Sequence, residues 1–320
     1  AGVYDTNVTA DLTIMEEATE LLERVNNGGK LPLITSCSPG WVKFCEHYYP
    51  DMLENVSSCK LPQQMFGAVA KTWYAEKMGI DPKDIFVVSI MPCTAKKFEI
   101  HRDGQAAAGY PDTDVSLTTR ELAKMIKRAG LNFAELPDEE FDAPLGIGSG
   151  AGTIFGATGG VMEAALRTAV ETITGKTAEN IEFTDVRGTE GVKEAEYDIN
   201  GLKVKVAVAS GLVNARKVLD MVKSGEKDYT FIEIMGCPGG CVNGGGQPIQ
   251  PASVRNFVDL KGLRAAALYK DDENLPIRKS HENPVVKTLY DEYFEKPGSH
   301  RAHEILHTHY VARPKVNVNK

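Results

Sequence analysis

The pattern of apolar and polar residues predicts strands and helices that alternate along the chain. Apolar residues recur at helical spacing over residues 13–25, where Thr13 and Glu16 have the spacing of a capping box. Thr118 and Glu121 have the same spacing and predict a capping box at the start of a later helix. Short continuous apolar runs are typical of strands, and the run at 85–90 predicts a buried one. The strands are predicted at 31–34, 85–90 and 231–234, and further helices at 41–49, 63–78, 118–129, 161–174, 215–224, 258–269 and 285–294.

This order of elements predicts an α/β fold with mainly parallel sheets flanked by helices. A chain of 320 residues is at the upper limit for one core, so we expect two lobes with an active site buried between them. We place the lobes at about 1–130 and 131–250, with a C-terminal helical wrap at 251–320. Asn200-Gly201, between two alternating runs, predicts a β-hairpin.

Composition excludes some classes of function. The net charge is −8 and no basic stripe is present, which argues against a nucleic-acid partner. No apolar run approaches the roughly 20 residues of a membrane span, and the chain begins without a signal peptide. The six cysteines do not resemble a disulfide framework in a chain of this size, so we expect a reducing, cytoplasmic compartment.

Cysteines follow all three predicted strands. Cys37 and Cys93 each come directly after a strand, and Cys237 and Cys241 form a Cys-x3-Cys pair in a glycine-rich loop after the third. Ligands bind at the carboxyl ends of parallel strands, and soft thiolates select zinc, copper(I) or iron–sulfur clusters. This dispersal is unlike the two close pairs of a zinc ribbon and favours a cluster between lobes. We assign the remaining cysteines, Cys45 and Cys59, to packing.

Charged residues near these motifs allow two interpretations. Lys96, three residues after Cys93, would favour a thiolate nearby, or it is an exposed surface charge. Glu17, Glu20 and Arg24 share one face of the first helix. Their spacing alone predicts a solvated face with a weak Glu20–Arg24 pair.

Two further motifs resemble known binding sites only weakly. The glycine run at 146–152 lacks the spacing and the preceding strand of a dinucleotide loop, so close packing of a helix is the better explanation. His303-Glu304 and His307 match H-E-x-x-H, in which two histidines bind zinc and the glutamate acts as base. The alternative is a pair of surface histidines on a helix.

The motifs TSCSPGW at 35–41, MPCTAKKFE at 91–99 and EIMGCPGGCVNGGGQP at 233–248 resemble the signature stretches of the FeFe hydrogenases. Four further segments are also similar: SSCKLPQQMFGA, SGAGTIFGATGGVMEAALR, RKSHENP and AHEILH. The resemblance therefore covers essentially the whole chain, and it accounts for the H-E-x-x-H motif of the C-terminal segment without a zinc site. It implies the catalytic domain alone. Ferredoxin-like modules and the start of this domain are expected upstream of Ala1.

The resemblance implies an H-cluster, in which a 4Fe–4S cubane is joined to a diiron unit with carbonyl, cyanide and azadithiolate ligands. It implies that the cubane ligands are Cys93, Cys237 and Cys241, with Cys241 bridging to the diiron unit. It implies that Lys96 binds a cyanide and that the diiron pocket is lined by Met91, Pro92, Met235, Gln63 and Phe155. The implied proton route runs through Cys37, Glu17, Ser57 and Glu20, with Arg24 near its mouth.

One position departs from the family pattern TSCCP, whose second cysteine ligates the cubane. Here that position is Ser38. Serine oxygen is a harder and weaker ligand for iron than thiolate. Three arrangements stay open: Ser38 ligates, Cys37 ligates and leaves the relay, or the cubane is incomplete.

The implied function is reversible dihydrogen oxidation and proton reduction, coupled to ferredoxin or NAD. The expected partners are dihydrogen, protons, ferredoxin-like domains or electron-transfer subunits, and cluster maturation proteins. A non-catalytic relative for iron–sulfur assembly or hydrogen sensing is the alternative, and a plain 4Fe–4S electron carrier is a third. Met91, Lys96 and Met235 serve only the diiron unit in the family, so their presence favours the enzyme.

Overall fold

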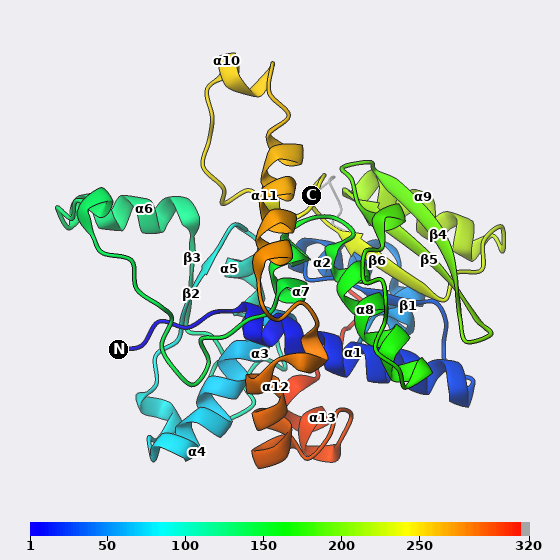
Figure 1. Cartoon of the computed structure of the whole chain (residues 1–320), viewed down its shortest axis with the longest axis horizontal. Helices are drawn as coiled ribbons and strands as arrows, with labels where there is room; N and C mark the ends of the chain where they lie inside the picture. The colour runs from blue at the N-terminus through cyan, green and yellow to red at the C-terminus, as the bar shows by residue number, and fades with distance from the viewer. Residues whose placement is uncertain (315–320) are drawn as a thin grey trace.

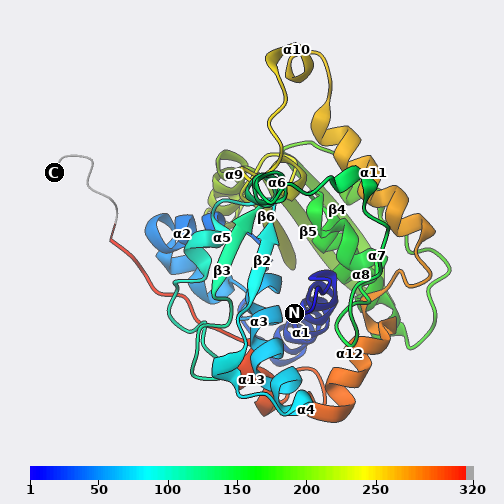
Figure 2. The same ribbon diagram turned by 90° about the vertical axis from the view of Figure 1, so that its left-hand side faces the viewer.

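The computed structural model describes residues 1–314, and helix α1 (Asn7–Asn27) lies at the centre of the molecule (Figures 1 and 2). The predicted helix is confirmed, but it starts at Asn7 rather than Thr13. The predicted capping box is wrong, because the Thr13 hydroxyl donates to the Thr9 carbonyl 2.7 Å away, one turn back. Apolar residues alone did not mark the helix start, because α1 continues towards its N-terminus through polar positions that are also buried.

A four-stranded sheet with the order β1-β6-β5-β4 forms the larger layer. β1 pairs with β6 in parallel, β6 with β5 in parallel, and β5 with β4 in antiparallel register. Asn200 and Gly201 connect β4 to β5 with positive φ values of 54° and 86°, which confirms the predicted hairpin. The strands are β1 (Leu33–Thr35), β4 (Val192–Ile199), β5 (Leu202–Ser210) and β6 (Phe231–Met235).

Helices cover both faces of this sheet, because apolar side chains of β5 point alternately to one face and to the other. Val206 and Val208 belong to the core formed with α1 and α8, whereas Ala207 and Ala209 belong to the core formed with α2 and α9. β1, β6 and the second half of β5 are therefore buried on both faces, as their apolar runs predict, whereas the edge strand β4 exposes residues such as Glu194 and Glu196. The covering helices are α2 (Pro39–Tyr48), α8 (Gly160–Thr174) and α9 (Leu212–Lys223).

The second sheet has two parallel strands, β2 (Val88–Met91) and β3 (Val115–Thr118). The prediction of a strand here is confirmed, but the prediction that it is buried is wrong. Val88 is 47% exposed and Ile90 is 38% exposed. Within residues 1–314, no second layer covers these two side chains, although the apolar run has the character of a strand buried on both faces.

The remaining helices surround α1 and extend from the two sheets. A third core joins α1 and α3 to α12 and α13 of the C-terminal region. The capping box predicted at the start of α6 is confirmed by reciprocal bonds between Thr118 and Glu121. These helices are α3 (Pro62–Val69), α4 (Ala75–Met78), α5 (Lys96–Glu99), α6 (Thr119–Arg128), α7 (Gly150–Thr153), α10 (Ala252–Arg255), α11 (Leu260–Asn274), α12 (Pro284–Leu289) and α13 (His300–Leu306).

The α/β fold with mainly parallel sheets is confirmed. The boundary predicted near residue 130 does not separate the two sheets, since β1 precedes it and pairs with β6. Part of the predicted C-terminal wrap, residues 315–320, lies outside the described residues. Across residues 1–314, no helix is both long and apolar enough to cross a membrane.

Candidate active site

Loops at the ends of β1, β2 and β6 bring distant cysteines together. The Cys37 sulfur lies 3.8 Å from the Cys241 sulfur and 3.6 Å from the Met235 sulfur. Burial raises the pKa of the Cys237 thiol, and the thiols of Cys93 and Cys37 raise it further because they are close enough to repel its charge. We name Cys37, Cys93, Cys237 and Cys241 the cysteine cluster.

Glycines allow the loop after β6 to lie directly on the segment after β2. The Gly246 amide donates to the Pro92 carbonyl at 2.9 Å. A Cβ atom on Gly244 would overlap that carbonyl oxygen, and one on Gly246 would lie 2.8 Å from the Cys93 amide nitrogen. Glycine is therefore required for these backbones to approach each other, and the approach brings the loop that carries Cys241 against the one that carries Cys93.

Ser38 and Cys37 are neighbours in sequence but have different surroundings. The Ser38 hydroxyl caps α2 by accepting from the Trp41 amide at 3.4 Å, and it lies against Gly236. Cys37 instead faces Cys241 and Met235. Ser38 thus caps α2, a role that the sequence did not reveal. Because Gly236 has no side chain, Ser38 also lies close to the loop that carries Cys237.

Lys96 is buried beside the cysteine cluster, so its interpretation as a surface charge is wrong. It is 6% exposed, and its ammonium lies 2.7 Å from the Glu99 carboxylate. Burial alone would lower the pKa of Lys96, but Glu99 and the Cys37 thiol raise it overall and keep the ammonium charged. Its nitrogen has no well-oriented hydrogen-bond acceptor among the described residues.

The other residues predicted for this pocket surround the same loops. Met91 ends β2, Pro92 receives the loop after β6, and Met235 ends β6. Phe155 packs in the same apolar core as Met235. Gln63 is buried and donates to the Lys96 carbonyl at 3.3 Å and to Glu99 at 3.1 Å.

These residues fit an anionic iron–sulfur centre. Thiol groups supply soft ligands, the glycine backbones leave room for close approach, and the buried Lys96 ammonium, which Glu99 contacts on one side, can still donate to an anion. Cys45 and Cys59, assigned to packing, are buried at 0% and 2% exposure and lie outside this set, which confirms that assignment.

The Glu17 face of α1 is not solvated, which overturns the prediction from spacing. Glu17 is 3% exposed and accepts from the Thr35 hydroxyl at 2.6 Å. Burial raises the pKa of Glu17 to about 7, with a further rise from the charge of Glu20, while the Thr35 and Ser57 hydroxyls act in the opposite direction.

Glu20 lies between Ser57 and Arg24 and forms hydrogen bonds with both. The Ser57 hydroxyl donates to Glu20 at 3.0 Å and also interacts with Glu17, so it lies between the two carboxyl groups. Arg24 pairs with Glu20 at 2.5 Å, as predicted, and donates to carbonyls of the 54–56 segment. We name Glu17 and Glu20 the carboxylate pair.

Sequence reasoning missed two residues of this region. Thr35 holds Glu17, and Glu99 neutralises Lys96. Thr35 lies in the TSCSPGW motif, which was the only available signal. Glu99 follows Lys96 by three residues, a spacing that places two side chains on one helical face.

The histidines of the H-E-x-x-H motif are engaged elsewhere. The two ring nitrogens of His307 lie 2.8 Å from the Ser58 hydroxyl and 3.1 Å from the Glu16 carboxylate. The His303 ring stacks on that of His307 at a centroid distance of 4.0 Å, and Glu304 is exposed. With both nitrogens of His307 bonded to protein groups, the arrangement argues against the zinc interpretation.

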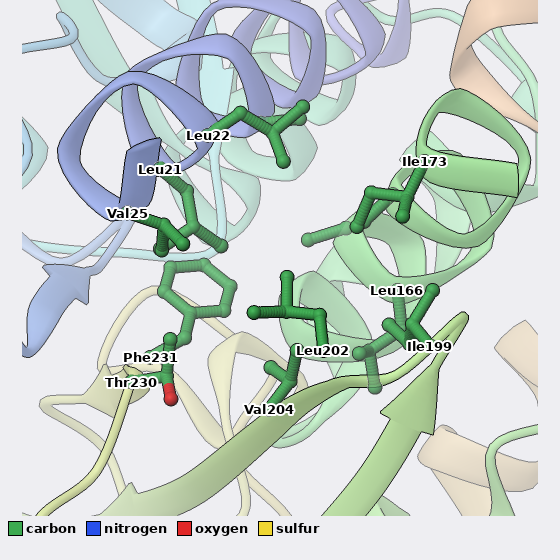
Figure 3. Close-up of a pocket in the computed structure, with 13 residues that line it drawn as sticks. Leu21, Leu22, Val25, Leu166, Ile173, Ile199, Leu202, Val204, Thr230 and Phe231 are labelled. Carbon is green, nitrogen blue, oxygen red and sulfur yellow. The ribbon is translucent and has the colours of Figure 1, made fainter. Parts of the chain in front are cut away.

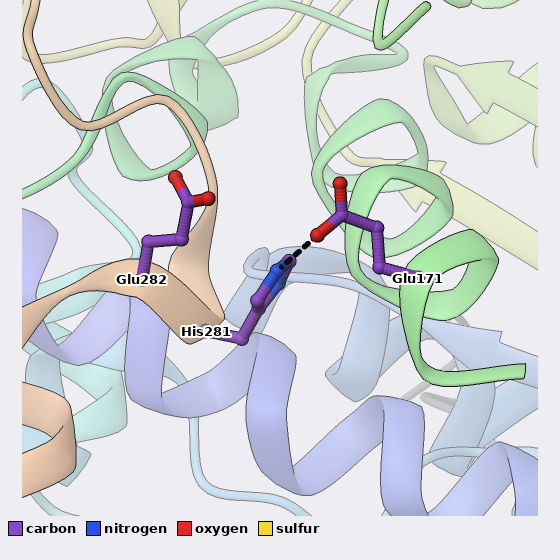
Figure 4. A group of neighbouring side chains, drawn as sticks. All are labelled: Glu171, His281 and Glu282. Atoms are coloured by element: carbon purple, nitrogen blue, oxygen red, sulfur yellow. Dashed lines mark hydrogen bonds and ion pairs between the residues drawn. The ribbon is translucent and has the colours of Figure 1, made fainter. Parts of the chain in front are cut away.

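Another possible set of metal ligands lies outside the cysteine cluster (Figure 4). The ligand atoms of Glu171, His281 and Glu282 are within 4.8 Å of one another. Lys279 already pairs with both carboxylates, at 2.9 and 2.8 Å, and His281 bonds Thr168 and Glu171 through its two nitrogens. Ion pairs and hydrogen bonds therefore explain this set without a metal.

An apolar pocket lies between α1, α8 and the sheet (Figure 3). Its walls include Leu21, Leu166 and Phe231, and Thr230 supplies the one polar side chain. It contains none of the predicted site residues. In the glycine run at 146–152, Gly148 and Gly152 pack closely against Asn7 at the start of α1, as the close-packing explanation predicts.

Comparisons with known proteins agree with this geometry. The family model described as "Iron only hydrogenase large subunit, C-terminal domain" matches residues 1–245, and "Iron hydrogenase small subunit" matches residues 258–313. The NADP-reducing hydrogenase subunit HndD of Solidesulfovibrio fructosivorans is 51% identical over 98% of this chain and 54% of its own length. Iron hydrogenase 1 of Clostridium pasteurianum is 53% identical over 96% of this chain and 54% of its own length.

More distant relatives and solved structures complete the comparison. Protein NAR1 of Arabidopsis thaliana is 32% identical over 97% of this chain and 69% of its own length. A variant of apo [FeFe]-hydrogenase HydA1 from Chlamydomonas reinhardtii has a TM-score of 0.84 and 44% identity, over 98% of this chain and 85% of that chain. The chain spans about half the length of the two curated hydrogenases above. By the matched family, the identities and the fold, this chain belongs to the iron-only hydrogenases.

Proposed function

We propose that this chain oxidises dihydrogen and reduces protons reversibly at an H-cluster, a 4Fe–4S cubane joined to a diiron unit with carbonyl, cyanide and azadithiolate ligands. Cys93, Cys237 and Cys241 would hold the cubane, and Cys241 would link it to the diiron unit. The observation that carries the proposal is Lys96: a buried ammonium beside the cysteine cluster, with no well-oriented acceptor among the described residues. An anionic cyanide ligand would satisfy it.

When bound, the H-cluster supplies the metal site and the amine base at which dihydrogen is split, together with a route for electrons. The protein supplies position and shielding. Glu99 and Gln63 fix Lys96 from one side, so its remaining protons are available to the cluster. Met235 and Phe155, which share one apolar core, and Met91 at the end of β2 would line the site of the diiron unit with apolar groups that exclude water.

Proton movement falls to the residues between the cysteine cluster and the surface. Cys37 faces the cluster, and Glu17 can gain or lose a proton near neutral pH because burial raises its pKa to about 7. The Ser57 hydroxyl lies between Glu17 and Glu20, and Arg24 holds Glu20 at the outer end. These contacts support the Glu17, Ser57 and Glu20 part of the predicted route, and its first step from Cys37 rests on the family.

The fourth cubane position would be held by Ser38 or by Cys37, or the cubane would be incomplete. Cys37 carries the softer atom and lies 3.8 Å from the Cys241 sulfur. If Cys37 ligates, Ser38 or water begins the proton route instead. Cytoplasmic location, an electron partner of the ferredoxin or NAD-linked type, and maturation proteins stay predictions that rest on cysteine usage and the family.

A non-catalytic iron–sulfur assembly or sensing protein is the second candidate, since the cytosolic Fe-S cluster assembly factor narfl of Xenopus tropicalis is 28% identical over 98% of this chain. The higher identity to hydrogenases and the presence of Met91, Lys96 and Met235 favour the enzyme. The test is an infrared spectrum, an iron count and a dihydrogen uptake assay on protein produced with hydrogenase maturation proteins. Carbonyl and cyanide bands with dihydrogen uptake are expected. A cubane without these bands and without uptake would instead support the assembly or sensing role.

A further inference from the structure

His307, the second histidine of the H-E-x-x-H motif, has no role in the proposed chemistry. It is nevertheless linked to Glu20 of the carboxylate pair through a single residue, Ser58. It is almost fully buried, with a side chain 6% exposed. One nitrogen bonds the Ser58 hydroxyl and the other bonds Glu16, which is itself buried and accepts from the Tyr290 hydroxyl and the Gly298 amide. The ring is therefore fixed from two sides.

Ser58 connects His307 to Glu20. The Ser58 amide donates to the Glu20 carboxylate at 3.1 Å, beside the Ser57 hydroxyl at 3.0 Å, and both reach the same oxygen, Oε2. The other oxygen, Oε1, pairs with Arg24 at 2.5 Å and also lies 3.4 Å from the Ser58 amide, while the Cys59 thiol lies 3.9 Å from Oε2. Glu20 is thus held between two competing sets of donors, an outer one at Arg24 and an inner one on the 57–58 segment.

The 57–58 segment is itself held by two neighbours. On one side, the Ser57 amide donates to the Ile34 carbonyl of β1 at 2.9 Å. On the other side, the chain end lies antiparallel to it: the Thr308 amide donates to the Ser58 carbonyl at 2.7 Å, and Cys59 bridges to His307. His307 is the one side chain of this C-terminal strip for which a bond to Ser58 is recorded.

We propose that His307 is a positioning residue of the proton route: by fixing Ser58 it holds the inner donors on Glu20, so that Glu20 stays next to Ser57 and Glu17 instead of moving outward with Arg24. This inference rests on the proposed function of the carboxylate pair. It gives the C-terminal region, which matches the small-subunit family, a direct part in that route.

Two matched variants separate this role from a purely structural one. Asparagine places its amide near the nitrogen that faces Ser58, and glutamine places it near the nitrogen that faces Glu16. Each variant loses one bond and keeps the other, and His307→Asn should lose more stability, because its lost partner is the buried Glu16 carboxylate. His307→Gln should lower turnover by roughly three- to tenfold, the range that one ordinary hydrogen bond represents. His307→Asn should retain turnover, and His303→Ala, which alters only the exposed stacked ring, is the control.

A second readout does not depend on the cluster. In protein without the H-cluster, the infrared carboxylate bands of Glu20, assigned by difference from Glu20→Gln, should shift in His307→Gln and in Ser58→Ala but not in His307→Asn. Ser58→Ala removes the same bond from the other side and serves if His307→Gln does not fold. Unshifted Glu20 bands, or equal turnover in His307→Gln and His307→Asn while Glu17→Gln is impaired, would overturn the inference. Full turnover in Glu17→Gln would instead defeat the proposed proton route, and the infrared bands would still test the contact.

Discussion

The cysteine cluster draws its side chains from three loops spread over 200 residues, whereas the carboxylate pair comes from successive turns of one helix, α1. The cluster is assembled by strand ends and by glycines that let Pro92 and Gly246 meet. The carboxylate pair is fixed by partners from other elements, Thr35 of β1 and Ser57. The cysteine cluster thus depends on how closely separate backbone segments approach each other. The carboxylate pair depends instead on which neighbouring residues bury that polar face of α1 and form hydrogen bonds with it.

The largest effect is expected from removing the exchangeable acid of the carboxylate pair. Glu17→Gln keeps the shape of the side chain but cannot carry a proton, so turnover should fall by about 100-fold or more while iron content is unchanged. The exposed Glu23 of the same helix provides the control, and Glu23→Gln should retain full turnover. Near-normal turnover in Glu17→Gln would mean that protons take another path.

A smaller loss is expected at the cysteine cluster. Lys96→Met removes the buried ammonium, so the protein should retain less of the diiron unit, measured by its carbonyl and cyanide bands after maturation. Lys97→Met is the control, because Lys97 is 42% exposed and pairs with Glu121 instead.

Glu99→Gln in the Lys96→Met background removes the carboxylate that would be left unpaired. If this double variant regains the diiron bands, the loss came from an uncompensated Glu99 and not from a missing contact to the cluster.

The raised pKa of Glu17 predicts how stability depends on pH. Its pKa is 4.5 ordinarily and about 7 in the fold, so between these values the folded state binds the proton more tightly than the unfolded chain does. Glu17 should therefore lower stability progressively as pH rises from 4.5 through 7, by on the order of 3 kcal/mol in total. Denaturant unfolding of protein without the cluster at pH 5 and pH 8 should show a smaller difference in Glu17→Gln. An unchanged difference would show that Glu17 is not the group responsible.

The smallest effect is expected at Ser38, because replacing it by cysteine has two opposite consequences. Ser38→Cys adds a soft ligand next to the cysteine cluster and should raise iron content towards a complete cubane, with higher turnover. It also replaces the oxygen that caps α2, so the protein without iron should lose about 1 kcal/mol of stability. Iron analysis and denaturant unfolding measure the two. Equal iron content and unchanged electron-resonance spectra of the cubane would show that Ser38 or Cys37 already completes it.

The sequence by itself determined the features that depend on near neighbours. Asn200-Gly201 fixed a hairpin, Thr118 and Glu121 fixed a helix start, and the apolar run before Cys237 fixed a buried strand. Each of these rests on interactions within a few residues, which a pattern can report. The cysteines at strand ends were also readable, because parallel strands place such residues at one edge.

Only the tertiary structure decided which polar groups are buried. The spacing of Glu17 and Glu20 is that of an exposed face, but β1 and the 57–58 segment cover it. For Lys96 and His307 the pattern left a surface position open as one of two interpretations, yet the fold buries both side chains. Conversely, the apolar run of β2 is partly exposed. Burial is set by contacts between segments far apart in sequence, and local periodicity carries no information about which segments meet.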